Sequence, residues 1–249
     1  SNSNIGFPLT VQYNQLIKIE NGDGIAMSPR IVNFGPDDGK LESLREAFPG
    51  ETDIEWVDSR LPIDELSEIL KDTRAIILTE HTDVTAELAT RCPELRLVQT
   101  VSAGTDYVDK TALGELGVKV SNNGGGNAVA VAEHTVTLIV GVYRKLDLQY
   151  KHVSAGEWDG NIRGDWYGQA HELTGKTVGI IGLGRIGTQL ARRLQGWDCE
   201  IIYSDIVSPE PDIASELGLK KVTTDELLET ADVVTLHVPL NQQTKGMIS

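Results

Sequence analysis

The chain has 249 residues, 40% of them hydrophobic, which is enough for one large domain or two modest ones with their own cores. Its formal net charge of −15 excludes nucleic acid and anionic membrane surfaces as partners, because both would be repelled. Only two cysteines, no apolar run of about 20 residues and no export signal predict a cytoplasmic protein with buried reduced thiols and no metal site.

The first part of the chain predicts a tail followed by a parallel α/β domain. Residues 1–26 are rich in Asn, Ser and Gly without periodicity, so we expect a tail, whether tag, leader or misassigned start. A folded domain is expected over 27–125, where strand-like and helix-like segments alternate. The expected strands are 30–34, 54–57, 75–79 and 95–100, and the expected helices are 40–48, 63–70 and 84–91.

The fourth expected strand runs into a turn of small residues, VSAGTDYVD, at 101–109. Ligands of open parallel sheets bind beyond the carboxyl ends of strands, where such a turn exposes backbone N–H groups. A substrate carboxylate could bind there. The alternative is an ordinary strand-to-helix turn whose helix is capped by Thr105 or Asp106.

Glycines at 124–126 precede a long helix and suit a hinge at a domain boundary. The helix is expected from an apolar stripe with helical spacing, made by Val129, Ala132, Val136, Ile139, Tyr143 and Leu146. Glu133 and His134 lie early in it, and a structural hydrogen bond explains them better than acid–base chemistry. Trp158 and Trp166 follow among polar residues, in a segment expected to wrap a surface and able to contact a partner subunit.

The most informative stretch is TVGIIGLGRIG at 177–187, a buried strand that enters a glycine-rich turn. Gly182 would permit the tight turn, and Gly184 would let the backbone approach a pyrophosphate. Gly187 would let the next helix, expected over 185–197, pack against the strand. The N–H groups and dipole of that helix would bind the phosphates.

A second strand at 200–204 ends at Asp205, 18 residues after Gly187. A carboxylate at this place would bind the adenosine ribose and repel a 2′-phosphate, so NAD is expected rather than NADP. The alternative is a structural turn with an unrelated surface aspartate. Beyond Asp205 we expect helices at 213–217 and 224–230, the second capped by Thr224, and a strand at 233–237.

Four motifs together resemble the D-isomer-specific 2-hydroxyacid dehydrogenase family, in particular its phosphoglycerate-dehydrogenase-like members. They are SAGTDYVD at 102–109, NAVAVAEHT at 127–135, GLGRIG at 182–187 with Asp205, and LHVPLNQQTKGMIS at 236–249. The resemblance begins near Pro29. It implies a flavodoxin-like substrate domain at 27–125, then an incomplete Rossmann NAD-binding domain at 126–249, closing over NAD and a small D-2-hydroxy or 2-oxo acid. It also implies a homodimer.

The resemblance further implies roles for single residues. The amides of Ala103, Gly104 and Thr105 would hold the substrate carboxylate, and Val131 would line the nicotinamide pocket. The other residues implied in cofactor binding are Gly182, Gly184, Arg185, Ile186, Gly187, Asp205, His237, Val238, Pro239 and Thr244. Among these, the amides of Arg185 and Ile186 would face the pyrophosphate, and the turn at 237–239 would border adenine and ribose.

The family's catalytic Arg, Glu and His are expected beyond Ser249, so no catalytic residue is assigned within the chain and no turnover is expected from it. Only three strands of the second unit are expected, where a complete Rossmann domain has about six. The histidines present, His81, His134, His152, His171 and His237, do not match the acid–base position. Phosphoglycerate-, glyoxylate- and lactate-like substrates stay open. The alternatives are an NAD-sensing co-repressor-like scaffold and a cofactor-binding fragment without turnover.

Overall fold

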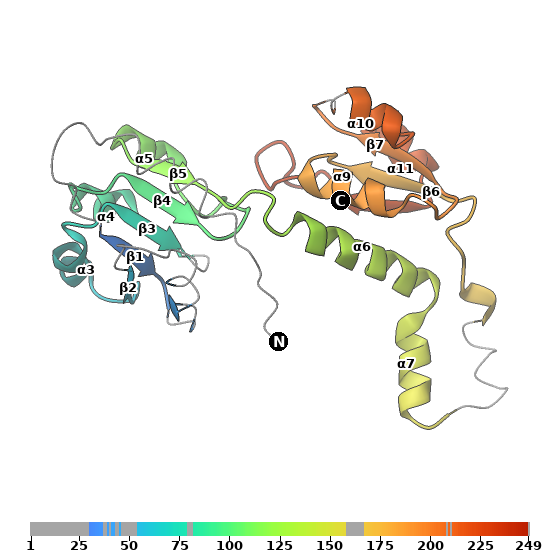
Figure 1. Cartoon of the computed structure of the whole chain (residues 1–249), viewed down its shortest axis with the longest axis horizontal. Helices are drawn as coiled ribbons and strands as arrows, with labels where there is room; N and C mark the ends of the chain where they lie inside the picture. The colour runs from blue at the N-terminus through green and yellow to red at the C-terminus, as the bar shows by residue number, and fades with distance from the viewer. Residues whose placement is uncertain are drawn as a thin grey trace. The chain divides into compact units, whose positions relative to one another are not determined.

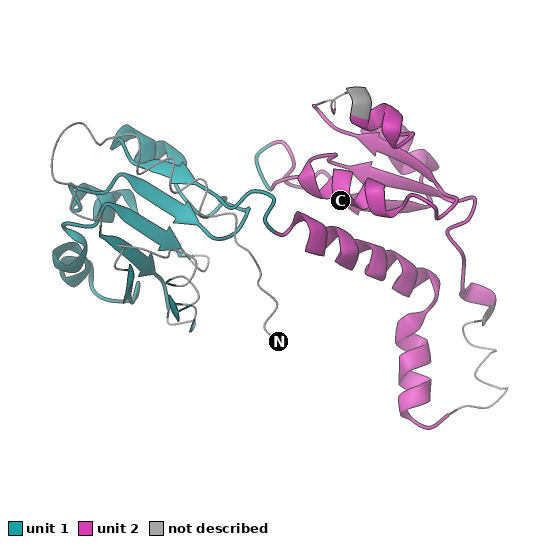
Figure 2. Cartoon of the chain, in the orientation of Figure 1, with its two compact units in different colours: residues 1–126, 240–242 teal, residues 127–239, 243–249 magenta. Residues whose placement is uncertain are grey.

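The structure is a computed structural model that describes residues 30–36, 39, 41–42, 45, 54–78, 82–157, 167–207, 209 and 211–248. Three expected features lie outside these ranges: the tail, most of the helix expected at 40–48, and the tryptophans Trp158 and Trp166. The chain divides into two compact units (Figure 2). The first unit consists of residues 1–126 and 240–242, and the second of residues 127–239 and 243–249.

The first unit contains a parallel sheet whose five described strands follow the order β2-β1-β3-β4-β5 (Figure 1). The strands are β1 (Ile31–Phe34), β2 (Ile54–Val57), β3 (Ala75–Leu78), β4 (Leu97–Thr100) and β5 (Lys119–Ser121). Every residue of β1, β3 and β4 is buried, as expected for central strands covered on both faces. The edge strand β5 was missed, because its short, half-exposed sequence KVS carries no apolar run.

Three helices of the first unit are α3 (Ile63–Leu70), α4 (Ala86–Thr90) and α5 (Lys110–Glu115). Thr85 caps α4 by accepting the Leu88 N–H, and Asp109 caps α5 by accepting the Ala112 N–H. The cap expected at Thr105 or Asp106 is therefore wrong, because α5 begins later. One core cluster gathers alternate strand residues such as Phe34, Ile76 and Val98 with the apolar sides of these helices.

The second unit contains a parallel sheet of four described strands in the order β8-β7-β6-β9. They are β6 (Thr177–Ile181), β7 (Glu200–Ser204), β8 (Lys220–Lys221) and β9 (Val233–Leu236). The expectation of three strands was wrong by one, because β8 is a two-residue edge strand of exposed lysines. The two parallel sheets confirm the predicted α/β class.

Three helices of the second unit follow its strands along the chain: α9 (Arg185–Arg193), α10 (Pro211–Glu216) and α11 (Thr224–Thr230). Helix α9 is shorter than the expected 185–197, since its C-cap is Leu194. The cap of α11 is Thr223, which accepts the Glu226 N–H, rather than Thr224. A short 3-10 turn, η2 (Tyr167–Gln169), precedes β6.

The single long helix expected from Asn127 is two helices, α6 (Ala128–Tyr143) and α7 (Leu146–Ser154). Lys145 separates them with a left-handed φ of 54°. The inner stripe of α6 packs in the core of the second unit against α9, and Ala128 rather than Val129 takes its first buried place. Val129 and Leu146 are 48% and 54% exposed, so both were wrongly placed in the stripe.

In the described ranges, no helix is long and apolar enough to cross a membrane, and no group of three or more His, Cys, Asp or Glu residues could hold a metal ion. Cys92 is a buried free thiol, whereas Cys199 is only half-buried, contrary to expectation. Burial raises the pKa of both thiols above the usual value.

Candidate functional site

Three strand ends meet at one edge of the second sheet, because β6 pairs in parallel with β7 on one side and β9 on the other. The Gly182 N–H donates to the Ser204 carbonyl at 2.9 Å, and the His237 N–H donates to the Ile181 carbonyl at 2.8 Å. These bonds place the glycine turn between Asp205 and the segment 237–239. The residues implied in cofactor binding on these three segments therefore share one edge of the sheet.

The three glycines of the turn meet three different requirements. Gly182 has a φ of +93°, and a Cβ there would lie 2.8 Å from Val238 Cγ1. A Cβ on Gly187 would lie 2.3 Å from the Gly182 carbonyl oxygen, so α9 packs directly on the turn. Gly184 is different: a Cβ there would meet no atom within 4 Å. The backbone at the start of α9 is thus open to a ligand.

Asp205 is bonded to the glycine turn itself. Its Oδ2 accepts the Leu183 N–H at 2.7 Å, and its Oδ1 accepts the Val207 N–H at 2.9 Å. The alternative of an unrelated surface aspartate is therefore wrong. Each carboxylate oxygen keeps a second lone pair, which suits the ribose hydroxyls of a dinucleotide. The geometry of the turn, the open backbone at Gly184 and this carboxylate fit NAD.

The start of α9 supplies donors for an anion. Arg185 and Ile186 begin α9, and the N–H groups in the first turn of a helix point out of its N-terminal end. Gly184, the N-cap, offers no side chain that could satisfy them. The Leu183 N–H is engaged by Asp205, so a pyrophosphate here would be bound by the first turn of α9 and its dipole.

The segment after β9 is the third segment at this edge of the sheet, beside the glycine turn and Asp205. His237 is half-buried, its Nε2 lies 3.0 Å from Thr235 Oγ1, and burial lowers its pKa below the usual value. Its imidazole is therefore neutral at pH 7. Thr244 donates its hydroxyl to the Pro239 carbonyl, which ties the following turn back to the segment. Val131 lies apart from these residues in sequence, half-buried in α6.

The turn after β4 lies at the carboxyl edge of the first sheet. Ala103 and Gly104 are exposed there, and Thr105 is half-buried with its Oγ1 accepting from Lys110 Nζ at 3.0 Å. Asn122 Nδ2 donates to the Ala103 carbonyl at 2.6 Å. The sequence analysis did not identify Asn122, although its position directly after β5 puts it at the same edge of the sheet.

The described histidines have separate surroundings. His134 is exposed on α6, and its neighbour Glu133 pairs with Arg193 of α9 at 3.1 Å, which supports the structural interpretation of that pair. His152 Nδ1 lies 2.6 Å from Glu157 Oε2. His171 meets the Tyr143 ring edge-on, with centroids 5.9 Å apart.

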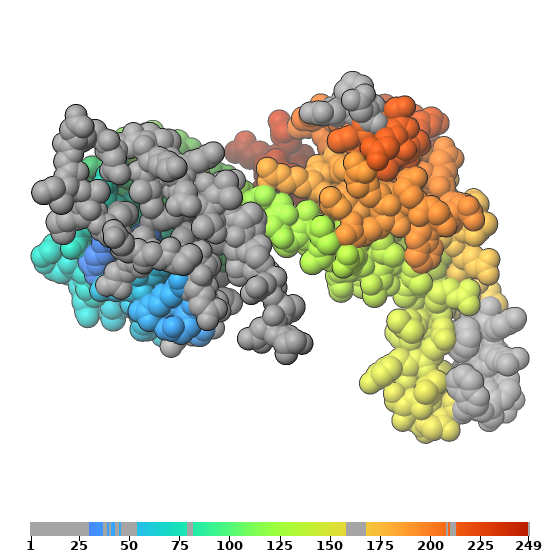
Figure 3. Space-filling view, viewed as in Figure 1, coloured from blue at the N-terminus to red at the C-terminus, as the bar shows by residue number. Residues whose placement is uncertain are grey.

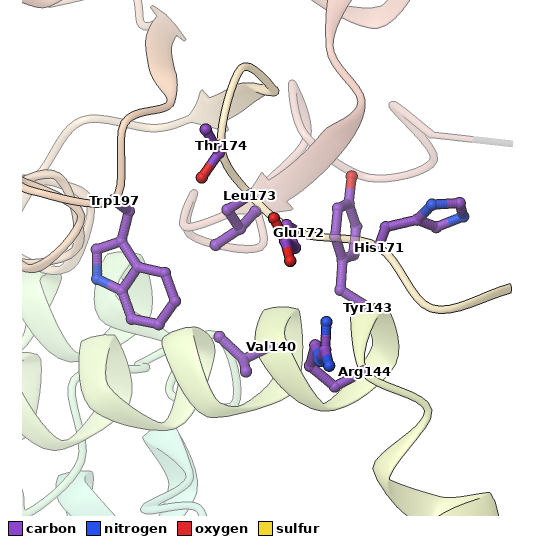
Figure 4. Close-up of a pocket in the computed structure, with 8 residues that line it drawn as sticks. All are labelled: Val140, Tyr143, Arg144, His171, Glu172, Leu173, Thr174 and Trp197. Carbon is purple, nitrogen blue, oxygen red and sulfur yellow. The ribbon is translucent and has the colours of Figure 1, made fainter. Parts of the chain in front are cut away.

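A hollow of about 200 Å³ lies between the end of α6, residues 171–174 and Trp197 (Figure 4). These residues precede β6 and β7, so the hollow is near the amino ends of the strands. It is therefore at the opposite edge of the sheet from the glycine turn, and it does not belong to the candidate cofactor site. Its lining residues are Val140, Tyr143, Arg144, His171, Glu172, Leu173, Thr174 and Trp197.

Comparisons with known proteins agree with these features. Residues 136–249 match the family profile described as "D-isomer specific 2-hydroxyacid dehydrogenase, NAD binding domain". The chain is 36% identical over 187 residues to a formate dehydrogenase of Chaetomium thermophilum, covering 72% of this chain and 50% of that protein. It is 34% identical over 186 residues to a D-3-phosphoglycerate dehydrogenase of Archaeoglobus fulgidus, covering 74% of this chain and 34% of that protein.

A solved structure with the same fold is that of D-lactate dehydrogenase from Aquifex aeolicus complexed with NAD and lactic acid. The TM-score is 0.70 at 28% identity, covering 86% of this chain and 62% of that one. The chain spans half or less of the length of the two curated relatives described above. The chain belongs to the D-isomer-specific 2-hydroxyacid dehydrogenase family, and its residues 136–249 match the NAD-binding domain of that family.

Proposed function

We propose that the chain supplies the substrate loop and the cofactor domain of an NAD-dependent oxidoreductase. The enzyme would transfer hydride between NAD and a small D-2-hydroxy acid or its 2-oxo acid, of phosphoglycerate, glyoxylate or lactate type. The observation that carries the proposal is the bond from the Leu183 N–H to Asp205 Oδ2, because it joins the phosphate-binding turn to the ribose-binding carboxylate.

The residues of the chain would divide the binding between them. The first turn of α9, from Arg185 and Ile186, would hold the pyrophosphate, and Asp205 would accept hydrogen bonds from the adenosine ribose. The segment 237–239 would border the adenine and ribose, and Val131 would line the nicotinamide pocket. NAD, when bound, supplies the hydride acceptor. In the first unit, the amides at 103–105 would hold the substrate carboxylate.

The open backbone at Gly184 gives a direct test of the cofactor site. A methyl group at this position meets nothing in the protein, so Gly184→Ala should fold with an unchanged unfolding midpoint. The same methyl would stand where the pyrophosphate approaches, and we expect NAD to bind at least about tenfold more weakly in titration calorimetry. Gly168→Ala, also in open space in the second unit, is the matched control. Equal NAD affinity in the two variants would contradict the proposed site.

We also propose that the protein is a homodimer through α6 and α7. Six large apolar side chains on these helices are exposed: Val129, Leu138, Val142, Leu146, Tyr150 and Val153. Helix α7 has no buried residue, and in Figure 1 it turns away from the sheet of its own unit. Parts of both helices lie on the molecular surface in the view of Figure 3. A second copy of the chain would cover this face.

The thiols support a reducing compartment, so we propose that the protein acts in the cytoplasm. Cys92 and Cys199 are unpaired. Free thiols of this kind, one buried and one half-buried, are ordinary where glutathione and thioredoxin keep cysteines reduced.

A further inference from the structure

The turn after β4 has three consecutive backbone carbonyls held by hydrogen bonds. The Ser102 carbonyl accepts from Thr100 Oγ1 at 2.9 Å and from the Asn123 N–H at 3.1 Å. The Ala103 carbonyl accepts from Asn122 Nδ2 at 2.6 Å. The Gly104 carbonyl accepts from Ser102 Oγ at 3.0 Å. Side chains therefore fix the orientation of three successive peptide groups.

Fixing a carbonyl also fixes the N–H group of the next residue. In a planar trans peptide, the C=O and the following N–H point in opposite directions. Holding the carbonyls of residues 102–104 thus turns the N–H groups of Ala103, Gly104 and Thr105 away from the bonds that hold them. Within the part of the chain that the structure describes, none of these three N–H groups donates to a protein acceptor. They are available to an anion.

Among the side chains that hold the turn, Asn122 has a distinct place. Thr100 and Ser102 lie in β4 and in the turn itself, whereas Asn122 comes from beyond β5, 19 residues further along the chain. The peptide that it holds joins Ala103 to Gly104. Glycine tolerates both signs of φ, so this peptide is the one in the turn that rotates most easily when its carbonyl is released.

We propose that Asn122 is a positioning residue for the substrate carboxylate. By holding the Ala103 carbonyl, it keeps the Gly104 N–H directed at the bound carboxylate. This role rests on the proposed function, which places the carboxylate at the amides of residues 103–105. Asn122 touches the turn through one hydrogen bond, and its effect on substrate is transmitted by the peptide group between residues 103 and 104.

The test uses two probes, D-lactate and D-lactamide, which differ only in that the amide replaces the carboxylate. Each probe is titrated into isotope-labelled protein, and binding is followed by NMR through the amide signals of residues 103–105. Asn122→Leu keeps the side-chain shape and adds no charge, but it removes the donor. We expect it to bind D-lactate about tenfold more weakly, with D-lactamide binding and the unfolding midpoint unchanged. The Gly104 amide signal should also move in the ligand-free variant, because its peptide is released. Asn122→Gln restores a donor and should recover part of the loss.

Asn123→Leu is the matched control, because it changes the neighbouring side chain and keeps the backbone N–H that holds Ser102. The role of Asn122 is overturned if Asn122→Leu binds D-lactate as tightly as the unmodified protein does. It is overturned as well if Asn123→Leu loses as much affinity for D-lactate as Asn122→Leu. It is also overturned if the Gly104 signal stays in place in Asn122→Leu. A different result would contradict the proposed function itself: the unmodified protein would bind D-lactate and D-lactamide equally well, and the turn would then not be a carboxylate site. The failure of the role of Asn122 and the failure of the proposed function can therefore be told apart.

Discussion

The half-buried neutral imidazole of His237, at the carboxyl edge of the second sheet, makes stability depend on pH. Burial lowers the pKa of His237 below its ordinary 6.5, so below that pH the unfolded chain takes up the proton more readily than the folded one. The stability from the neutral ring is complete above about pH 6.5 and is lost as the pH falls further. At the scale of single residues, protonation of His237 in acid therefore lowers the free energy of unfolding.

Replacing His237 should flatten this pH dependence. In denaturant unfolding between about pH 7.5 and pH 5.5, His237→Gln should lose less stability than the unmodified protein. The difference cannot exceed about 1.4 kcal/mol per pH unit, which is the limit for one proton. His134→Gln, at an exposed position of α6, is the matched control for exchanging a histidine for glutamine. A His237→Gln slope equal to that of the unmodified protein would contradict the explanation.

Sequence spacing predicted that the glycine turn and Asp205 lie together, but it did not predict the bond that holds the turn after β4. The three glycines and Asp205 have fixed separations, because one strand–turn–helix unit and the next strand position them. The bond from Asn122 to Ala103 joins residues on two different strands, and no local pattern specifies such a pair. Roles in ligand binding stay predictions for both groups.

At the scale of elements, burial decides which segments could be predicted. Strands β1, β3, β4 and β6 are buried on both faces and show continuous apolar runs. The edge strands β5 and β8 are short and largely exposed, so their sequences resemble loops. The break between α6 and α7 was missed because the apolar spacing continues past it to Leu146, whereas the left-handed Lys145 that ends the helix has no sequence signal.

The exposed face of α7 gives a test of the proposed dimer. Leu146, Tyr150 and Val153 lie on one side of this helix, and Tyr150 is 74% exposed. Tyr150→Glu places a charge in the proposed interface and should convert a dimer to a monomer at micromolar concentration, measured by light scattering. Lys151→Glu makes a larger charge change on another side of the same helix and should leave the dimer intact. A monomeric unmodified protein would contradict the proposal.

At the scale of the whole molecule, the chain combines two parallel α/β units that offer different groups to a ligand. In the described residues, the first unit offers the exposed turn after β4, and the second offers the glycine turn with its carboxylate. The proposed function assigns the substrate carboxylate to the first and the dinucleotide to the second. The family membership and the profile match over 136–249 support this division.

Nucleotide choice tests the central claim most directly, because Asp205 is fixed on the turn and carries the charge that would meet a 2′-phosphate. Titration calorimetry of the unmodified protein should show NAD binding at least about tenfold more tightly than NADP. Asp205→Ala should bring the affinities for NAD and NADP closer together. It should also weaken the binding of both nucleotides, because it releases the Leu183 and Val207 N–H groups. Glu200→Ala, at the opposite end of β7, is the control for loss of a charge and should preserve the ratio. Equal dissociation constants of NAD and NADP in the unmodified protein would contradict the account.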